Sequence, residues 1–517
     1  MFPEWMKGAP TPFSSVLVAN RGEIAVRVIK AVKEAGLRSI AVYSDPDSNA
    51  LHVEIADDAV HLPGNSLTEN YLNSEAIILA AKSSGAQAIH PGYGFLSERA
   101  DFARDVANAG IVWVGPSPEA IETMGDKISA RSRMIESGVP VIPGDEIAIP
   151  EGSDHMGALA SAAARVGYPL LLKASAGGGG KGMRVVHEPK MLRTEYEAAA
   201  REASAAFGDG TVYVERLLTG ARHIEIQVLA DKHGNCIHLN ERDCSLQRRH
   251  QKVIEEAPST AVSNDLRKAM GESAVLAAKA VDYVGAGTVE LLLSPNGQYF
   301  FLEMNTRLQV EHPVTEMITG VDLVQKQLEI ASGIKLGISQ DSVGINGHSI
   351  EARIYAEDAK KGFLPSVGTL GVWIPPSGPG IRMDSGVRQG DQVTVDFDPM
   401  LAKLIVHASD RESAIRRMDN ALSSFVALGV TTNIGFLRNA LLHPSFTSGS
   451  ITTDFLDSTP IEEFDPNYSN PKIIVSIAAS AKRLGLDKSA NILSSSDEGD
   501  HSGHSGDPFK TLSRRLP

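Results

Sequence analysis

The sequence predicts a chain of several domains with both α/β and α+β architecture. Strands and helices alternate over residues 14–127, which favours a parallel sheet covered by helices on both faces. Residues 128–333 mix helices with antiparallel strand pairs, and residues 347–456 are richer in strands and turns. The total of 517 residues is also more than one domain usually holds, since most domains have about 100–150 residues.

The N-terminal region has the pattern of a Rossmann-like parallel sheet. Residues 16–19 form a short apolar strand, Asn20 is a suitable N-cap for the next helix, and Gly36 ends that helix. Further strands are expected at 39–43, 88–90 and 111–114, and further helices at 74–84 and 101–109. A strand and helix alternation of this kind predicts parallel strands.

Composition and charge exclude several classes of function. No apolar run approaches the roughly 18 residues of a spanning helix, so no membrane partner is expected. A net charge of -14 argues against a nucleic-acid partner. The only two cysteines, Cys236 and Cys244, favour a reducing compartment, and the N-terminus lacks the pattern of a signal or transit peptide. We therefore expect a cytoplasmic enzyme.

A glycine-rich turn follows a predicted strand at 168–174. Glycines 177–180 lie between Lys173 and Lys181, so that backbone N–H groups can approach an anion while the lysines supply positive charge. The spacing is not that of a Walker A loop, because Gly182 stands where Ser or Thr is required. A flexible loop without a ligand is the alternative, but we favour a mobile lid over nucleotide phosphates.

A predicted hairpin over residues 288–305 carries two carboxylates. Pairing Leu293 with Gln298 places Glu303 on the same face as Glu290 and diagonal to it, about 7–8 Å away. A solvent-facing pair of glutamates is the alternative. Buried among these apolar neighbours, however, the two acids would require a neutralising cation.

The segment that ends the hairpin adds an amide, a cation and a third acid. Asn305 brings an amide oxygen to the two acids, and Mg²⁺ that bridges nucleotide phosphates is the favoured ligand. Arg307 and Glu311, four residues apart, could hold a small anion and act as a base, respectively. Taken alone, that pair would more often be an ordinary salt bridge.

Five motifs together resemble biotin carboxylase, the ATP-grasp component of acetyl-, propionyl- and methylcrotonyl-CoA carboxylases and of pyruvate carboxylase. The motifs are ANRGEIA at 19–25, HPGYGFLSE at 90–98, SAGGGGKGM at 175–183, ERDCSLQRRHQK at 241–252 and EMNTRLQVEHP at 303–313. The resemblance runs in family order from about residue 15 to residue 456.

The resemblance implies three domains and a tail. The N-terminal biotin carboxylase domain would span 14–127, and the ATP-grasp domain 128–333, with its lid at about 146–216. The C-terminal biotin carboxylase domain, of mixed and β-rich structure, would span 347–456. The tail at 461–517 lies outside the resemblance, and its polar low-complexity stretch predicts partial disorder.

The implied reaction is the ATP- and bicarbonate-dependent carboxylation of biotin N1′ through carboxyphosphate. The metal ligands would be Glu290, Glu303 and Asn305, for Mg²⁺ or Mn²⁺. The implied ATP-binding residues are Lys127, Lys173, Gly177, Gly178, Gly179, Gly180, Glu215, Leu218, His223, Gln247, His250, Glu290 and Glu303.

The same resemblance assigns roles at the bicarbonate and biotin site. Arg307, Gln309 and Val310 match the bicarbonate cradle. Glu311 matches the base that deprotonates bicarbonate, and Arg353 the arginine that stabilises the biotin enolate. The residues that line the same site are Lys252, His250 and Gln247. If residues 248–252 form one extended strand, alternate basic side chains share a face.

The resemblance also bears on partners. No Met-Lys-Met-like biotinylation motif occurs, so biotin is expected on a separate carrier protein, with a separate carboxyltransferase subunit that chooses the acyl-CoA. The complex would be an acetyl- or propionyl-CoA carboxylase, and this chain is expected to form a homodimer, as is usual in the family.

Two other classes of function fit the sequence less well. A different ATP-grasp ligase, such as a carbamoyl-phosphate synthase-like enzyme, should lack the runs at 247–252 and 307–311 together, and both are present. A non-catalytic assembly subunit on the same fold should have lost at least one of five key residues. All five are present: Glu290, Glu303, Arg307, Glu311 and Arg353.

Overall fold

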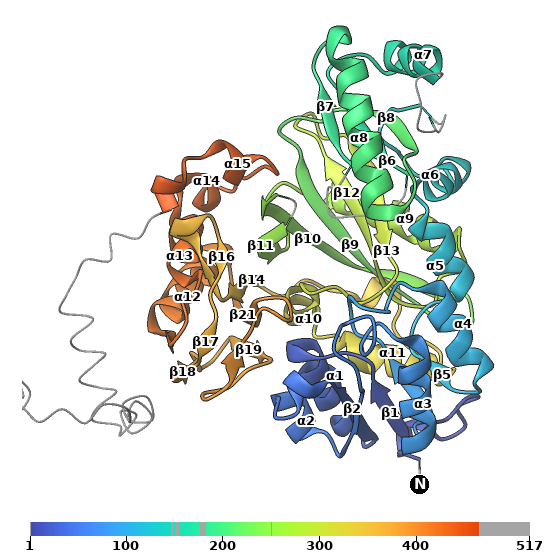
Figure 1. Ribbon diagram of the computed structural model, residues 1–517, viewed down its shortest axis with the longest axis vertical. Coiled ribbons are helices and arrows are strands. Elements are labelled where there is room, and N and C mark those ends of the chain that lie inside the picture. Colours follow the sequence, from blue (N-terminus) through green and yellow to red (C-terminus); the bar gives the residue numbers. More distant parts are fainter. Residues whose placement is uncertain (1, 146–148, 150–154, 176–181, 250, 465–517) are drawn as a thin grey trace, which may run out of the picture. The chain divides into compact units, whose positions relative to one another are not determined.

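The computed structural model describes residues 2–145, 149, 155–175, 182–249 and 251–464. All of these residues belong to one unit of the chain, Met1–Pro466. Three sheets of three or more strands organise it (Figure 1). None of the helices in the described ranges combines the length and the apolar character that crossing a membrane would need.

The N-terminal sheet has five parallel strands in the order β3-β2-β1-β4-β5. The strands are β1 (Ser15–Val18), β2 (Arg38–Tyr43), β3 (Asp58–His61), β4 (Ala88–His90) and β5 (Val112–Trp113). The helices that connect them are α1 (Gly22–Glu34), α2 (Leu51–Ile55), α3 (Ser74–Ser84) and α4 (Ala100–Asn108). The predicted parallel sheet is confirmed, while β3 was not predicted because it is short and mostly exposed.

One detail of that prediction was wrong. Asn20 does not cap α1, whose N-cap position is held by Arg21 without a side-chain hydrogen bond. The Asn20 side-chain amide instead donates to the carbonyl oxygens of Pro91 and Tyr93, at 2.7 and 2.8 Å. The side chain therefore ties the end of β1 to the loop after β4.

A smaller antiparallel sheet in the order β7-β6-β8 follows. It consists of β6 (Leu170–Ala174), β7 (Arg184–Val186) and β8 (Val212–Arg216), and it packs with α7 (Met156–Val166) and α8 (Leu192–Phe207). The predicted glycine-rich lid loop, Gly177 to Gly180, lies outside the described residues, and so do His250 and most of the predicted tail.

The largest sheet has eight strands in the order β13-β12-β9-β10-β11-β14-β21-β19. Its first five strands in this order are β13 (Tyr299–Asn305), β12 (Gly285–Leu293), β9 (Arg222–Ala230), β10 (Cys236–Arg248) and β11 (Gln251–Ala257). The remaining three are β14 (His348–Tyr355), β21 (Met400–Ala408) and β19 (Ile381–Ser385). The sheet thus runs without interruption from the middle region of the chain into the C-terminal one, because β11 pairs with β14.

Helices cover parts of this sheet. Helix α10 (His312–Thr319) packs against β10, β11, β14 and β21, and α9 (Asn264–Lys279) packs against β9, β10 and β12. Helix α11 (Leu323–Ala331) contacts both β12 and α1, whereas α12 (Arg411–Ser424) packs against β14 and β21. The short helix α10 therefore lies over the junction between the middle and C-terminal regions.

The register of the β12–β13 hairpin differs from the prediction. Leu293 pairs with Tyr299 rather than with Gln298, and one extra residue, Leu302, bulges from β13. An unbroken register would place Glu290 opposite Leu302 and turn Glu303 to the other face, since side chains alternate along a strand. The bulge instead brings Glu303 directly opposite Glu290, so both carboxylates share a face.

We expect Ile226→Ala to lower the free energy of unfolding by about 2–5 kcal/mol, because truncating a buried aliphatic side chain leaves a cavity. Ile226 is 0% exposed and packs on the apolar face of β9. Leu79 on α3 is 67% exposed, and Leu79→Ala should change the free energy by less than about 0.5 kcal/mol. Urea denaturation measures both changes, and equal losses would contradict this account of the core.

Candidate active site

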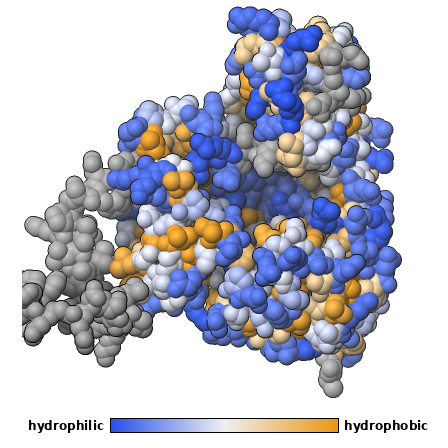
Figure 2. All heavy atoms as spheres, in the orientation of Figure 1, coloured by the Kyte–Doolittle hydropathy of each residue, from blue (hydrophilic) through white to orange (hydrophobic). Residues whose placement is uncertain are grey.

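A cavity of about 370 Å³ opens beside the β12–β13 hairpin. It is bounded by α5 (Pro118–Gly125), the start of α6 (Lys127–Glu136), β8, β13 and the loop after β13. Its charged and amide side chains are Glu98, Lys127, Arg131, Glu215, Glu303, Asn305 and Arg307. Figure 2 shows a hydrophilic hollow in the viewed face of the molecule. Two of the three predicted metal ligands, Glu303 and Asn305, therefore line one cavity with the predicted nucleotide residues Lys127 and Glu215.

Two of the predicted nucleotide residues, Lys127 and Glu215, line this cavity, and Lys173 contacts Glu215. Lys173 on β6 donates to Glu215 on β8 at 2.7 Å, and Arg131 lies 3.6 Å from the same carboxylate. Burial alone would lower the pKa of Lys173, but the Glu215 carboxylate raises it above the usual value. Burial lowers the pKa of Lys127. Leu218, half-buried, follows β8 in the adjoining loop.

The Lys252 ammonium lies at the centre of the site. It contacts the carboxylates of Glu225, Glu290 and Glu311, the last two at 2.9 and 2.7 Å. Burial would lower the pKa of Lys252, but these carboxylates hold it well above its usual value. The same ammonium keeps the pKa values of Glu225 and Glu290 below their usual range despite burial.

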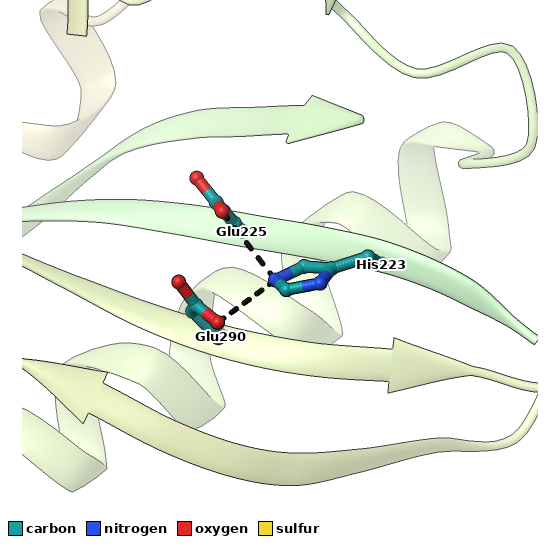
Figure 3. Close-up of side chains that lie close together, drawn as sticks. All are labelled: His223, Glu225 and Glu290. Atoms are coloured by element: carbon teal, nitrogen blue, oxygen red, sulfur yellow. Dashed lines mark ion pairs between the residues drawn. The ribbon is translucent and has the colours of Figure 1, made fainter. Parts of the chain in front are cut away.

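His223 joins the same cluster from β9 (Figure 3). Its Nε2 lies 2.9 Å from Glu290 Oε2 and 3.4 Å from Glu225 Oε1. Burial would lower the pKa of His223, but the two carboxylates raise it to about 10. The imidazole is therefore a second cation among the acids of the site at neutral pH.

The residues predicted to bind a metal lie next to one another. Asn305 Nδ2 donates to Glu290 Oε1 at 2.8 Å, and Gln309 Nε2 donates to the same oxygen at 2.7 Å. Burial and the neighbouring Glu290 carboxylate raise the pKa of Glu303. A divalent cation between the two acids would reverse that shift, since oxygen ligands of this kind suit Mg²⁺. The donor set therefore fits the implied metal.

Arg307 and Glu311 do not form the ordinary salt bridge with each other that was the alternative interpretation. Arg307 Nε donates to Glu98 at 2.9 Å, and its Nη2 donates to Asn305 at 2.8 Å. Glu311 is 1% exposed and contacts a cation with each oxygen. One contact is with Lys252, and the other is with Arg353 Nη2 at 2.8 Å. The predicted base and the predicted enolate-stabilising arginine are thus in direct contact.

The basic run at 248–252 is not one extended strand. Strand β10 ends at Arg248 and β11 begins at Gln251, with Arg249 at φ 48° in the connecting turn. The Arg248 guanidinium lies 3.8 Å from the centre of the Phe363 ring instead of in the acidic cluster. Gln247, however, is buried and pairs with Lys252 across the two strands, so two of the predicted site residues do lie together.

Four functional candidates were missed by the sequence reasoning: Glu98, Glu225, Arg242 and Glu255. Arg242 is fully buried and donates to Glu225 at 3.0 and 3.1 Å and to Gln309 at 2.8 Å. Glu255 accepts from Arg353 Nε at 2.5 Å, and burial raises the pKa of Glu255 to about 7.

A signal for Glu225 exists in the sequence. On β9, polar residues at 223, 225 and 227 alternate with apolar residues at 224, 226 and 228. Alternation with a period of two marks one polar face on a strand. Here that face is buried and carries ionisable groups, which is typical of a functional site.

Family models match nearly the whole described unit. The model described as "Biotin carboxylase, N-terminal domain" covers residues 12–121, and "Biotin carboxylase C-terminal domain" covers 351–458. Between them, "Carbamoyl-phosphate synthase L chain, ATP binding domain" covers 126–339. A biotin carboxylase of Nostoc sp. is 49% identical over 444 residues, which are 86% of this chain and 98% of the relative. This chain belongs to the biotin carboxylase family.

Longer relatives contain the same biotin carboxylase unit. The alpha subunit of mitochondrial methylcrotonoyl-CoA carboxylase from Dictyostelium discoideum is 52% identical over 86% of this chain and 63% of its own length. The mitochondrial propionyl-CoA carboxylase alpha chain of Caenorhabditis briggsae is 46% identical over 93% of this chain and 65% of its own length. The chain therefore spans less than two thirds of these curated relatives.

Solved structures of biotin carboxylases share the fold. The solved "beta-gamma-ATP" complex of Campylobacter jejuni biotin carboxylase has a TM-score of 0.83 and 46% identity to this chain. The match covers 86% of this chain and 99% of that one. The biotin carboxylase domain dimer of Hydrogenobacter thermophilus 2-oxoglutarate carboxylase was solved with MgADP, ADP and bicarbonate. It has a TM-score of 0.84 and 46% identity, and the match covers 88% of this chain and 99% of that one. The predicted architecture is confirmed.

We expect His223 to make the stability of this protein depend on pH when no metal is added. Its pKa is about 10 in the folded protein, against about 6.5 when unfolded. The contribution of His223 to the free energy of unfolding is therefore complete below about pH 6.5 and is lost as the pH rises towards 10. The loss is on the order of a few kcal/mol. The measurement is urea denaturation between pH 6 and 10, in which His223→Asn should flatten the decline.

The matched control for this experiment is the exposed His187. His187→Asn should leave the decline as it is in the unmodified protein. An equal decline in the His223→Asn variant would contradict the ion pairs described for His223.

Proposed function

We propose that this chain is an ATP-dependent biotin carboxylase that transfers a carboxyl group from bicarbonate to biotin N1′ through carboxyphosphate. The observation that supports this most directly is the position of Glu311. Its buried carboxylate lies between Lys252 and Arg353, 2.7 and 2.8 Å away. A base held beside two cations is suited to a reaction in which an anion loses a proton and anionic intermediates form.

The nucleotide would bind in the cavity beside β13. We assign Lys127 and Lys173 to the phosphates, Glu215 and Leu218 to the adenine, and His223 to the ribose. Gly177, Gly178, Gly179, Gly180 and His250 complete the proposal, although they lie outside the described residues. Relatives solved with an ATP complex or with MgADP support a nucleotide at this site.

The metal would be held by Glu290, Glu303 and Asn305. Bound Mg²⁺, or Mn²⁺ in its place, would neutralise phosphate charge during transfer. In the metal-free protein, Lys252 and His223 neutralise part of the same acidic cluster. Glu290 would thus have to exchange its contacts with Lys252 and His223 in order to hold the metal.

Bicarbonate would lie against Arg307, Gln309 and the backbone at Val310. Glu311 removes its proton, and the freed oxygen attacks the γ-phosphorus of ATP while ADP leaves. For this, bicarbonate must approach the Glu311 carboxylate that now contacts Lys252 and Arg353. Both cations then lie next to the negative charge that develops during the transfer.

Biotin would react in the second half of the site. Carboxyphosphate breaks down to CO₂ and phosphate, the phosphate takes the N1′ proton, and the resulting enolate attacks CO₂. The Arg353 guanidinium, fixed by Glu255 at 2.5 Å, is suited to stabilise the enolate oxygen. Gln247, beside Lys252, completes the proposed lining of this half.

We also propose that the reaction is the first half of an acetyl- or propionyl-CoA carboxylase. Biotin would be attached to a separate carrier protein, and a separate carboxyltransferase would complete the complex. The biotin carboxylase domain of the Hydrogenobacter relative was solved as a dimer, which supports a homodimer of this chain. Two free cysteines, Cys236 and Cys244, fit a reducing compartment such as the cytoplasm. The division into domains at 14–127, 128–333 and 347–456 is part of the same proposal.

The two alternatives are less well supported. The matched model named for carbamoyl-phosphate synthase covers only the middle of the chain, while both flanking models are described as biotin carboxylase. A non-catalytic subunit is disfavoured because Glu311, Arg353 and Lys252 retain a complete set of contacts.

We expect Glu311→Gln to lower biotin-stimulated ADP release by about 100-fold or more, since it keeps the shape of the side chain but removes the base. The measurement is ADP release with Mg-ATP and bicarbonate, with and without free biotin. If free biotin gives no stimulation of the unmodified chain, a biotinylated carrier protein replaces it. An unchanged rate in the variant would contradict the role of Glu311.

We expect Glu303→Gln to raise the Mg²⁺ concentration for half-maximal ADP release by about tenfold or more, because it removes one of two carboxylate ligands. The measurement is a Mg²⁺ titration at constant ATP. Glu272 lies exposed on α9, and Glu272→Gln is the matched control that should leave the titration unaltered. Equal curves for Glu303→Gln and the control would contradict the metal assignment.

A further inference from the structure

Lys403 is a buried cation outside the site described above. It lies on β21, with its side chain 0% exposed. Its ammonium donates to the carbonyl oxygen of Val310 at 2.9 Å. Val310 directly precedes Glu311, in the segment that the proposed function assigns to bicarbonate. A residue from the C-terminal part of the large sheet thus contacts the backbone of the candidate active site.

The other neighbours of this ammonium come from two further segments. Glu23 on α1 lies 3.3 Å away, and Asp384 on β19 lies 3.8 Å away. Tyr93, from the loop after β4, donates to the second oxygen of Glu23. The three donors of a lysine ammonium therefore face one carbonyl oxygen and two carboxylates, from three segments distant in the sequence.

Neutralising the two carboxylates does not account for all of these contacts. A lysine that only balanced charge would need contacts with Glu23 and Asp384. The bond to Val310 is also the shortest of the three, at 2.9 Å. A buried ion pair usually stabilises a fold no better than apolar residues of the same size would. Stability alone therefore does not explain why a lysine is buried at position 403.

The acceptor on Val310 determines what this bond holds in place. Because the peptide unit is planar, a fixed Val310 carbonyl oxygen also fixes the position of the Glu311 Cα atom. Glu311 is the N-cap residue of α10. Its backbone therefore lies between the Lys403 contact on one side and a helix packed on the large sheet on the other.

We propose that Lys403 is a positioning residue for the bicarbonate step. It holds the Val310–Glu311 peptide so that the Glu311 carboxylate stays aligned between Lys252 and Arg353. The inference rests on the proposed function, because it assigns Lys403 to the same base. Lys403 does not touch the substrate and acts only through this peptide, while Glu23 and Asp384 balance the charge of its ammonium.

The test compares Lys403→Met with Asp384→Asn. Lys403→Met removes the bond to Val310. Asp384→Asn keeps that bond and removes the charge of a carboxylate that lies 3.8 Å from the ammonium and also accepts from Arg382. Misplacement of a reacting group costs about 10- to 100-fold. We expect Lys403→Met to lower kcat/KM for bicarbonate by about that factor and to leave the KM for ATP within about twofold. Asp384→Asn should lower thermal stability but keep the bicarbonate kinetics.

A double variant covers the case in which the unpaired Glu23 carboxylate prevents folding. Lys403→Met combined with Glu23→Gln removes both charges, so it should be more stable than Lys403→Met alone but keep the bicarbonate defect. Unaltered bicarbonate kinetics in the double variant would overturn the proposal. So would an equal bicarbonate defect in Asp384→Asn, which would show that charge balance alone matters.

The unmodified chain separates this proposal from the function on which it rests. ADP release that depends on bicarbonate in the unmodified chain, together with unaltered bicarbonate kinetics in Lys403→Met, overturns only the role of Lys403. If the unmodified chain shows no dependence on bicarbonate, with free biotin or with a biotinylated carrier, both proposals fall.

Discussion

The buried contact of Lys252 with three carboxylates is the interaction on which the rest of the site depends. Without a cation at this point, Glu225, Glu290 and Glu311 would lie buried together as like charges, and acids in that situation take up protons instead of staying ionised. Lys252 and His223 keep the cluster charged before any ligand binds. The three carboxylates are therefore already ionised before a ligand binds. A bound cation has to displace a protein cation, but no carboxyl group has to lose a proton first.

The eight-stranded sheet explains how residues far apart in sequence reach this point. The strands β9, β11, β12 and β14 supply His223 and Glu225, Lys252, Glu290 and Arg353, respectively. Because these strands belong to one sheet, alternation along each strand is enough to direct the polar side chains to a common region. Helix α10 adds Glu311 at its N-cap position. The apolar side chains of the same strands fill the cores on the other face.

Much of the fold and of the site could be predicted from the sequence. Alternating elements indicated the parallel N-terminal sheet, and the motifs brought Glu290, Glu303, Glu311 and Arg353 into one hypothesis that their contacts support. What failed depended on local geometry that sequence patterns do not encode. The bulge at Leu302 altered the hairpin register, and the turn at Arg249 directed Arg248 away from the site. Long-range partners such as Glu255 need the tertiary fold to be recognised.

The pairing of β11 with β14 has a consequence for how such enzymes can be built and altered. These neighbouring strands come from the middle and the C-terminal parts of the chain, and they share an unbroken ladder of backbone hydrogen bonds. A cut between the two parts would leave the edges of two mostly buried strands unpaired, and unpaired strand edges promote aggregation. The C-terminal part is therefore not an exchangeable module. Chimaeras between carboxylases should place their junctions outside this sheet.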